Sequence, residues 1–351
     1  MLSELSGILE EVYALRSLFD IVFRMVAGFL TSFGFSLVAG ALFLKRAERF
    51  RAPVREDTPE THQAKNYTPT MGGIGILLSV IAASLIWCTL SAEVWIFLGC
   101  LGGFGLIGLW DDVFKLHYKK GIPESHKFGA QIIMGAIIVL AWYFIVAPPT
   151  AVSVPFFKGV APKLGIYLIP WAVFILVGAS NAVNLTDGLD GLATGSLIIS
   201  CSTLALICLI AGNYAFTLHL HIPNTNTAEI AVIGGIVVGA LMGFLWYNTY
   251  PAQLFMGDVG SLPLGAGLAL MALMARQELL LPLIGGVFVV ETLSVILQVV
   301  SFKLFGKRIF LMAPLHHHYE LKGLHEAKIT TRCVIITLIL SIFALALLPF
   351  H

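Results

Sequence analysis

Long apolar segments recur along the whole chain, and they constrain its fold more than any other feature. A helix needs about 20 mainly apolar residues to cross the hydrocarbon core of a bilayer. About ten segments approach that length, and they lie at residues 21–44, 71–90, 94–110, 128–147, 166–183, 192–212, 229–247, 260–275, 279–302 and 330–350. The alternating pattern of membrane strands is absent. The sequence therefore predicts an all-α polytopic membrane protein with about ten transmembrane helices.

The composition excludes a soluble protein. Hydrophobic residues make up 58% of the 351 residues and charged residues only 12%, whereas about a quarter of the residues in soluble proteins are charged. The same balance excludes a disordered chain. A net charge of +1 provides no concentrated basic face, so we expect no nucleic-acid partner. The five cysteines lie in apolar stretches without a CxxC pair, which favours small apolar residues over disulfides or metal ligands.

Residues 1–20 have a different pattern from the rest of the chain. They carry four acidic residues and one basic residue, Arg16, whereas a secretory signal begins with a basic region. Apolar residues spaced like Leu2, Leu5 and Leu9 favour a short amphipathic helix on the membrane surface. We therefore predict a surface segment at 1–20 and a single transmembrane domain at 21–351.

The basic residues orient the predicted spans. With ten spans, 16 of the 21 Lys and Arg residues fall in loops on one side of the membrane. By the positive-inside rule that side is cytoplasmic, and both termini face the outer, periplasmic side. The clusters of aspartate, asparagine and histidine then all lie at cytoplasmic span ends, where we expect the functional site.

Two adjacent carboxylates, Asp111 and Asp112, end a glycine-rich span. An ionised Asp at the bilayer centre costs about 2.5–3.5 kcal/mol, so the pair should lie at the membrane interface. Neighbours on a helix do not share a face, so the two side chains should have different partners. A solvated helix end is the alternative interpretation.

Four polar residues recur at a spacing of three in the segment Asn181-Ala-Val-Asn184-Leu-Thr-Asp187-Gly-Leu-Asp190. This spacing places them along one side of a helical turn. Asn donates and accepts hydrogen bonds, whereas Asp only accepts, so the row suits a sugar or base edge and a metal. The alternative is a purely structural helix cap.

The segment from Asn248 to Ser261 precedes another span. Asp258 within it either caps the following helix or binds a metal beside backbone N–H groups that favour phosphate. Phe255 either stacks on a planar ring or packs in the membrane.

Three consecutive histidines, His316, His317 and His318, lie in a cytoplasmic loop. Consecutive imidazoles do not readily converge on one zinc ion, and no Cys lies nearby. Contact with phosphate is favoured, and a surface run without function is the alternative.

Three further residues lie in or near the spans. Lys65, which precedes Thr-Pro-Thr-Met-Gly-Gly, is either a positive-inside anchor or a phosphate ligand. Glu291 and Gln298 share one face of a span, where an ionisable residue is a functional hypothesis by default. For Glu291 we favour a protonated or paired carboxyl within the bundle.

Five carboxylates are therefore expected on one cytoplasmic face: Asp111, Asp112, Asp187, Asp190 and Asp258. Two like charges about 4 Å apart repel by about 4 kcal/mol at an effective dielectric near 20, so such a cluster takes up protons or cations. Oxygen ligands select Mg²⁺ or Mn²⁺, and Mg²⁺ bridges carboxylates to substrate phosphates. The sequence predicts a pyrophosphate site at the membrane edge, suited to phosphoryl transfer from a nucleotide-sugar to a lipid phosphate.

Five linked motifs also carry a family resemblance. They are Thr-Pro-Thr-Met-Gly-Gly at 68–73, the Asp111-Asp112 pair, Asn-Ala-Val-Asn-Leu-Thr-Asp-Gly-Leu-Asp-Gly-Leu at 181–192, Phe-Met-Gly-Asp-Val-Gly-Ser at 255–261 and Pro-Leu-His-His-His-Tyr-Glu-Leu-Lys-Gly at 314–323. From about Lys45 to its C-terminus, the chain resembles the phospho-N-acetylmuramoyl-pentapeptide transferases of the polyprenyl-phosphate N-acetylhexosamine-1-phosphate transferase superfamily. The unbroken triple histidine favours this branch over relatives that use other sugars.

The resemblance implies a catalytic domain in the bacterial cytoplasmic (inner) membrane that transfers phospho-MurNAc-pentapeptide from UDP-MurNAc-pentapeptide to undecaprenyl phosphate. The products would be lipid I and UMP in the first membrane step of peptidoglycan synthesis, with Mg²⁺ required. Surrounding membrane lipid is a further partner, and a homodimer is left open.

By motif position, the resemblance implies Asp258 as the metal ligand, Asp111 as the base that deprotonates the lipid phosphate and Asp112 as its assistant. The implied substrate-binding residues are Lys65, Asn181, Asn184, Asp187, Asp190, Asn248, Phe255, Gln298, His316, His317 and His318. The family usually has Gly before Thr-Pro-Thr, whereas this chain has Tyr67, and this departure puts the role of Lys65 in question.

Two other functions fit parts of the pattern. The nearer is a transferase of the same superfamily that uses another donor, such as UDP-GlcNAc. The more distant is a cation-coupled transporter, which predicts charged groups near mid-membrane and a repeat relating the two halves. The carboxylates instead lie at one end of the spans, and we find no such repeat in the sequence.

Overall fold

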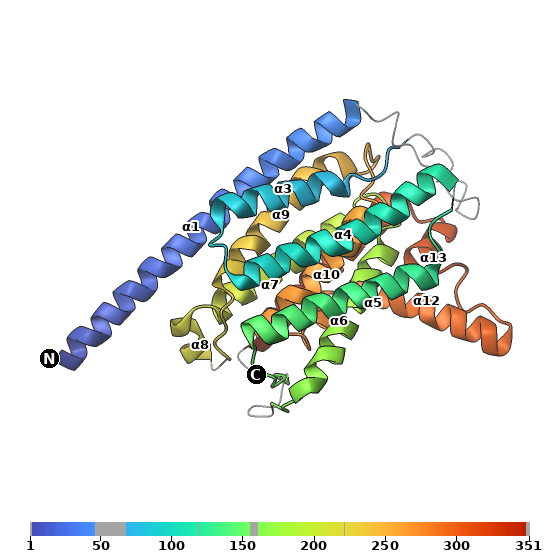
Figure 1. Cartoon of the computed structure of the whole chain (residues 1–351). Helices are drawn as coiled ribbons and strands as arrows, with labels where there is room; N and C mark the ends of the chain where they lie inside the picture. The colour runs from blue at the N-terminus through green and yellow to red at the C-terminus, as the bar shows by residue number, and fades with distance from the viewer. Residues whose placement is uncertain (1, 46–67, 119, 155–160, 221, 349–351) are drawn as a thin grey trace.

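The computed structural model describes residues 2–45, 68–118, 120–154, 161–220 and 222–348, without the side chains of residues 2–17, Ala215 and His219. In this part of the chain the secondary structure is helical, apart from one isolated β-bridge between Ala151 and Lys163 (Figure 1). The helices are α1 (Leu2–Lys45), α3 (Gly73–Trp87), α4 (Ala92–Tyr118), α5 (Glu124–Ala141), α6 (Leu168–Thr186), α7 (Leu192–Ala211), α8 (Tyr214–Leu220), α9 (Ala228–Asn248), α10 (Asp258–Met274), α11 (Leu281–Ile284), α12 (Gly286–Phe305), α13 (Leu315–Leu321) and α14 (Glu326–Leu347).

Each of the ten predicted spans coincides with an apolar helix. Eight helical segments within the described ranges are long and apolar enough to cross a membrane. Helices α3 and α10 are apolar but shorter, with 15 and 17 residues. The all-α fold is confirmed and the chain is a multi-pass membrane protein, whereas the number of crossings stays a prediction.

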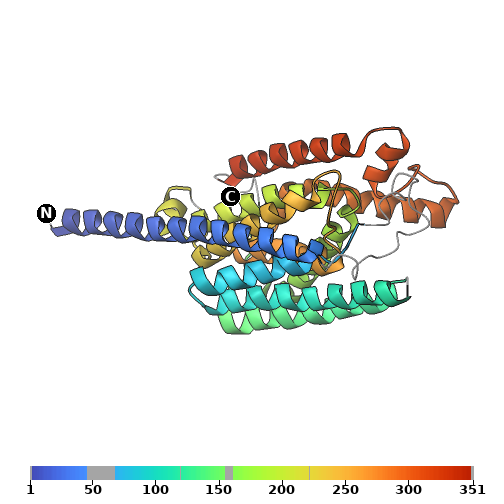
Figure 2. The same cartoon turned by 90° about the horizontal axis from the view of Figure 1, so that it is seen from above.

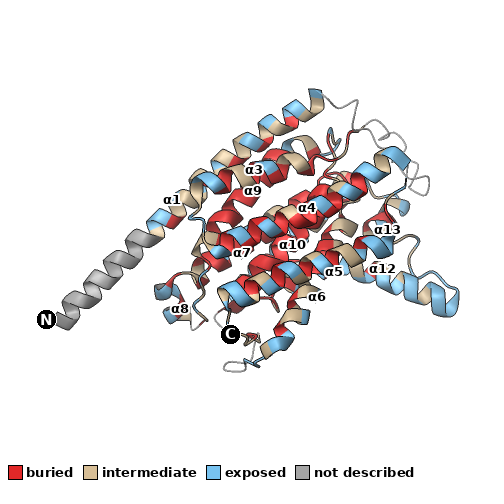
Figure 3. Ribbon diagram, in the orientation of Figure 1, coloured by how far each residue is buried: buried red, intermediate tan, exposed pale blue. Residues whose placement is uncertain are grey.

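Helix α10 lies at the centre of the bundle. All 17 of its residues are buried, and it packs against α3, α4, α6 and α7. A helix that is apolar on all sides belongs in such an interior position. Helices α1 and α12 lie at the periphery and expose much of their apolar surface (Figure 3), as helices that face lipid do.

A glycine brings the acidic ends of α4 and α10 into contact. A Cβ atom added to Gly108 would lie 2.1 Å from the carbonyl oxygen of Asp258, so the position has no room for a side chain. Small residues allow this close approach between membrane helices. Because α4 and α6 end where α5 and α10 begin (Figure 1), the packing gathers four polar helix ends at one end of the bundle.

Helix α1 runs without a break from Leu2 to Lys45. The predicted surface segment at 1–20 and the first predicted span therefore belong to one helix. Its N-terminal half projects beyond the other helices in both views (Figures 1 and 2), and the helix packs on α3 and α9. The placement of residues 1–20 on a membrane surface stays a prediction.

Candidate active site

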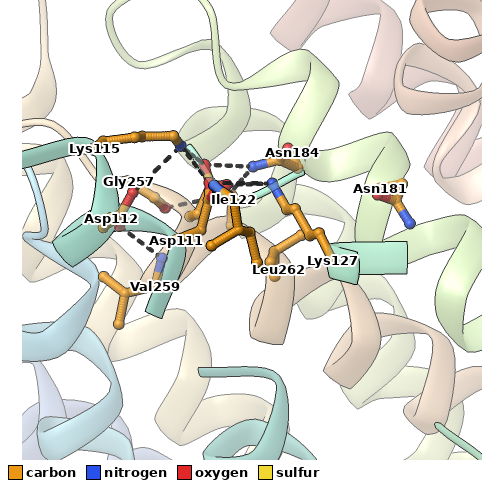
Figure 4. Close-up of polar contacts among 12 residues, drawn as sticks. Asp111, Asp112, Lys115, Ile122, Lys127, Asn181, Asn184, Gly257, Val259 and Leu262 are labelled. Carbon is orange, nitrogen blue, oxygen red and sulfur yellow. Dashed lines mark hydrogen bonds and ion pairs between the residues drawn. The ribbon is translucent and has the colours of Figure 1, made fainter. Parts of the chain in front are cut away.

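Three carboxylates from two helices meet at the polar end of the bundle. Asp111 and Asp112 lie about two turns before the end of α4, and Asp258 is the first residue of α10. Carboxylate oxygens of the three residues lie within 4.8 Å of one another, and all three residues are buried. Figure 4 shows the contacts around Asp111 and Asp112. The predicted convergence is confirmed for these three aspartates, whereas Asp187 and Asp190 do not belong to the group.

Two lysines, which the sequence analysis missed, neutralise part of this charge. The Nζ atom of Lys115 lies 2.7 Å from Asp111 Oδ2, 3.0 Å from Asp258 Oδ1 and 3.5 Å from Asp112 Oδ1. The Nζ atom of Lys127, from the first turn of α5, contacts Asp258 Oδ2 and lies 3.5 Å from Asp111 Oδ2. Three carboxylates and two ammonium groups leave an excess of one negative charge.

Backbone amides fix the two carboxylates of α4 in different directions. Ile122 N donates to Asp111 Oδ1 over 2.8 Å, and Val259 N donates to Asp112 Oδ2 over 3.0 Å. The expectation that adjacent aspartates have different partners is confirmed for these backbone donors, whereas both side chains share Lys115. Asp112 is thereby tied to the start of α10, whereas Asp111 is held by the loop before α5.

The asparagine row on α6 reaches the cluster through one member. Asn184 Nδ2 donates to Asp258 Oδ1 over 3.0 Å and to Ser261 Oγ over 2.8 Å. Asn181 lies apart from the carboxylates (Figure 4) and donates to Gln131 Oε1 over 2.6 Å. The regular spacing thus places the two side chains along one helix with different neighbours.

The two aspartates of the same row lie in the turn between α6 and α7. Asp190 is buried, and its Oδ2 accepts a 2.9 Å hydrogen bond from Ala252 N. Asp187 follows the last residue of α6 and is only partly buried. Burial raises the pKa of Asp187 to about 7, and the negative charges of Asp258 and Asp112 add to this shift. The negative charges of the cluster therefore act on Asp187 from a distance.

The loop before α10 joins the first motif to the acidic cluster. Phe255 N donates to Pro69 O, and Gly72 N donates to Phe255 O, both over 2.9 Å. Asn248 is buried and holds this loop, since its Nδ2 donates to Leu254 O over 3.0 Å. Phe255 itself is partly exposed, so its ring remains accessible while its backbone is fixed.

The three histidines have three different environments. His316 is 1% exposed. The Nδ1 atom of His317 lies 2.8 Å from Glu320 Oε2. His318 Nδ1 accepts a 3.1 Å hydrogen bond from Leu311 N. The run is therefore not a uniform surface strip, and its members are fixed by contacts within and around α13.

Gln298 and Lys65 are two further residues that were predicted to bind the substrate. Gln298 uses its side-chain amide on the backbone of the 309–310 segment: its Oε1 accepts from Ile309 N and Phe310 N, and its Nε2 donates to Phe310 O. Lys65 lies outside the described residues, as does Tyr67.

The cluster provides a donor set that fits a divalent cation. Its three convergent carboxylates offer only oxygen, which is the ligand type of Mg²⁺ and Mn²⁺. The excess negative charge that remains after Lys115 and Lys127 favours the binding of a cation. The same two ammonium groups suit an anionic substrate group beside that cation.

The fold and the site together define an integral membrane protein with a buried acidic centre at one end of a helical bundle. Comparisons with known proteins narrow this class. Residues 94–276 match glycosyl transferase family 4, and this range contains all three clustered aspartates. The Geobacter sp. (strain M21) and Citrifermentans bemidjiense (strain Bem) proteins named phospho-N-acetylmuramoyl-pentapeptide-transferase are each 45% identical over 343 residues, which is 96% of this chain and 96% of each relative. The chain belongs to glycosyl transferase family 4 and, within it, to the family of these transferases.

Proposed function

We propose that the chain transfers phospho-MurNAc-pentapeptide from UDP-MurNAc-pentapeptide to undecaprenyl phosphate, with lipid I and UMP as products. The observation that carries the proposal is the convergence of Asp111, Asp112 and Asp258 beside two lysines. The transferase names of relatives that match along nearly the whole chain support the choice of substrates.

The residues of the cluster divide the chemistry between them. Asp258 is the ligand that we assign to Mg²⁺, which when bound supplies positive charge to the diphosphate of the nucleotide. Asp111 takes the proton of the lipid phosphate, whose oxygen then attacks the phosphorus next to the sugar and releases UMP. Asp112 assists by holding the start of α10 through Val259 N. Lys115 and Lys127 balance the negative charge of the phosphates.

The nucleotide-sugar occupies the side of the cluster that faces α6, α13 and the loop before α10. Asn181 and Asn184 lie in the last turns of α6, and Asp187 and Asp190 follow it. The partly exposed ring of Phe255 suits stacking on uracil. The other residues that we assign to this substrate are Lys65, Asn248, Gln298, His316, His317 and His318.

The enzyme operates in the bacterial cytoplasmic (inner) membrane with its site on the cytoplasmic face. This orientation follows from the 16 basic residues on the loops of one side, and it places both termini in the periplasm. The lipid phosphate and the soluble nucleotide then meet where the polar helix ends leave the bilayer. A homodimer is compatible with this arrangement.

A release assay with purified protein tests the proposal. UDP-MurNAc-pentapeptide and UDP-GlcNAc are offered separately with undecaprenyl phosphate and Mg²⁺, and UMP is measured. We expect UMP from the first donor only. Release from UDP-GlcNAc alone would assign the chain to another donor, and no release from either would contradict the transfer reaction.

A further inference from the structure

Glu291 is a carboxylate inside α12 that the chemistry above does not use. It is 3% exposed, and its Oε2 accepts a 3.2 Å hydrogen bond from the backbone N of His316. The ring Nδ1 of His316 lies 3.2 Å from the same oxygen. A buried ionisable group in a membrane helix requires such partners. Both contacts connect α12 to the first turn of α13.

The opposite edge of the same ring lies against Gly188. A Cβ atom added to Gly188 would lie 2.3 Å from His316 Nε2, so the imidazole fills the space that any larger residue would need. Gly188 belongs to the turn between α6 and α7, with Asp187 before it and Asp190 after it. Glu291, His316 and Gly188 therefore form one continuous contact from α12 to the turn of the asparagine row.

We propose that Glu291 is a positioning residue for the nucleotide-sugar site. It accepts a hydrogen bond from the backbone amide of His316 and lies beside the ring, whose opposite edge packs against the turn that carries Asp187 and Asp190. The inference rests on the proposed function for the identity of the ligand. Loss of this hydrogen-bond acceptor releases α13 and the turn between α6 and α7. Binding of the nucleotide-sugar therefore weakens more than the chemical step, which depends on the aspartates of α4 and α10.

Three single variants test the contact to His316. Glu291→Gln keeps an oxygen that accepts the amide proton, whereas Glu291→Leu removes the acceptor. Thr292→Val is the matched control, because Thr292 Oγ1 donates to Phe288 O of its own helix. In Glu291→Leu we expect the KM for UDP-MurNAc-pentapeptide to rise at least about tenfold, with kcat within about threefold of wild type. Glu291→Gln and Thr292→Val should remain close to wild type in both constants. An unchanged KM in Glu291→Leu, or an equal loss in Glu291→Gln, would overturn the proposal.

A double-mutant cycle tests whether the three residues act as one contact. Gly188→Ala forces the ring of His316 away from the turn and should raise the KM as Glu291→Leu does. The KM of the double variant should then exceed the larger single-variant KM by less than about threefold, because each substitution breaks the same series of contacts. Effects that multiply would contradict the assignment.

Calorimetric titration of the same variants with UMP reads out nucleotide binding without turnover. We expect the affinity for UMP to fall in Glu291→Leu and Gly188→Ala, and equal affinity in wild type and both variants would overturn the inference. Thermal melting confirms that each variant is folded. If wild-type enzyme binds UMP in the titration but releases no UMP in the transfer assay, the proposed function is rejected. The UMP affinities of the variants would then still test the positioning role of Glu291.

Discussion

Both ends of the bundle carry paired charges, but the two groups of charges differ in their burial. At one end Arg24 pairs with Glu229 over 2.9 Å, and with the exposed Asp20 over 3.0 Å. Glu229 also accepts a 2.8 Å hydrogen bond from Thr89 N. The side chains of Arg24 and Glu229 are each 18% exposed and that of Asp20 is 63% exposed, so water hydrates these charges. At the other end three carboxylates share two lysines. The Arg24–Glu229 pair joins α1 to α9, whereas we propose that the buried cluster binds a cation and an anionic substrate group.

This difference indicates that burial distinguishes the two sites: the three aspartates of the cluster are between 2% and 8% exposed, whereas Arg24, Glu229 and Asp20 reach water. A partly exposed ion pair is hydrated and contributes little beyond packing. In the proposed function, the excess negative charge of the buried cluster binds a cation from outside the chain. Substitutions at the two ends should therefore separate loss of activity from loss of stability.

Substitution of Asp258 should have the largest effect. We expect Asp258→Ala to lower transfer by on the order of 10³-fold or more, because it removes several kcal/mol of charge stabilisation in the transition state. Glu229→Ala at the other end is the control and should keep kcat within about threefold of wild type. Initial rates of UMP release measure both. Near-normal turnover in Asp258→Ala would remove this residue from the metal role.

Replacement of Asp111 should slow the reaction without removing the nucleotide. Asp111→Asn keeps the acceptor for Ile122 N but loses the base, so we expect kcat to fall by about 10²–10⁴-fold. The KM for the UDP-sugar should change much less. If the KM rises and kcat survives, Asp111 is a binding residue rather than the base.

Loss of the Arg24–Glu229 pair should lower stability and leave the chemistry intact. Arg24→Ala removes the counter-ion of Glu229, and we expect a loss of roughly 1–3 kcal/mol in the free energy of unfolding. The melting temperature in detergent should fall while kcat stays near wild type. A fall in kcat without a fall in melting temperature would contradict the assignment of Arg24 and Glu229 to stability rather than to activity.

The last expected effect is a pH dependence of stability that comes from Asp187. Its pKa is raised to about 7 in the folded protein by burial, above the value near 3.9 of an unfolded chain. The folded state then binds more protons, so the stabilisation present at low pH is lost as the pH rises through about 4 to 7. Asp187→Asn should flatten the melting temperature measured from pH 5.5 to 8. An identical profile in wild type and Asp187→Asn would contradict this assignment.

The sequence predicted the elements better than their contacts. Apolar length alone located a helix in each of the ten predicted segments. The spacing within 181–190 predicted one common side for four polar residues, of which Asn184 reaches Asp258. Lys115 had a local signal, because it lies four residues after Asp111 on the same helix. Lys127 had none: its place beside Asp258 depends on how α5 packs beside α4 and α10, which no local pattern encodes. The same holds for His316, whose contacts with Glu291 and Gly188 join three distant segments.

A titration of purified protein with Mn²⁺, followed by electron paramagnetic resonance of the free ion, tests whether the aspartates of α4 and α10 share one divalent cation. Wild type and Glu229→Gln should each bind one Mn²⁺ with the same affinity, and Mg²⁺ should displace it. Asp258→Asn should lose this binding or weaken it at least about tenfold. Equal binding in all three proteins, or none in the wild type, would contradict a metal centre at the cluster.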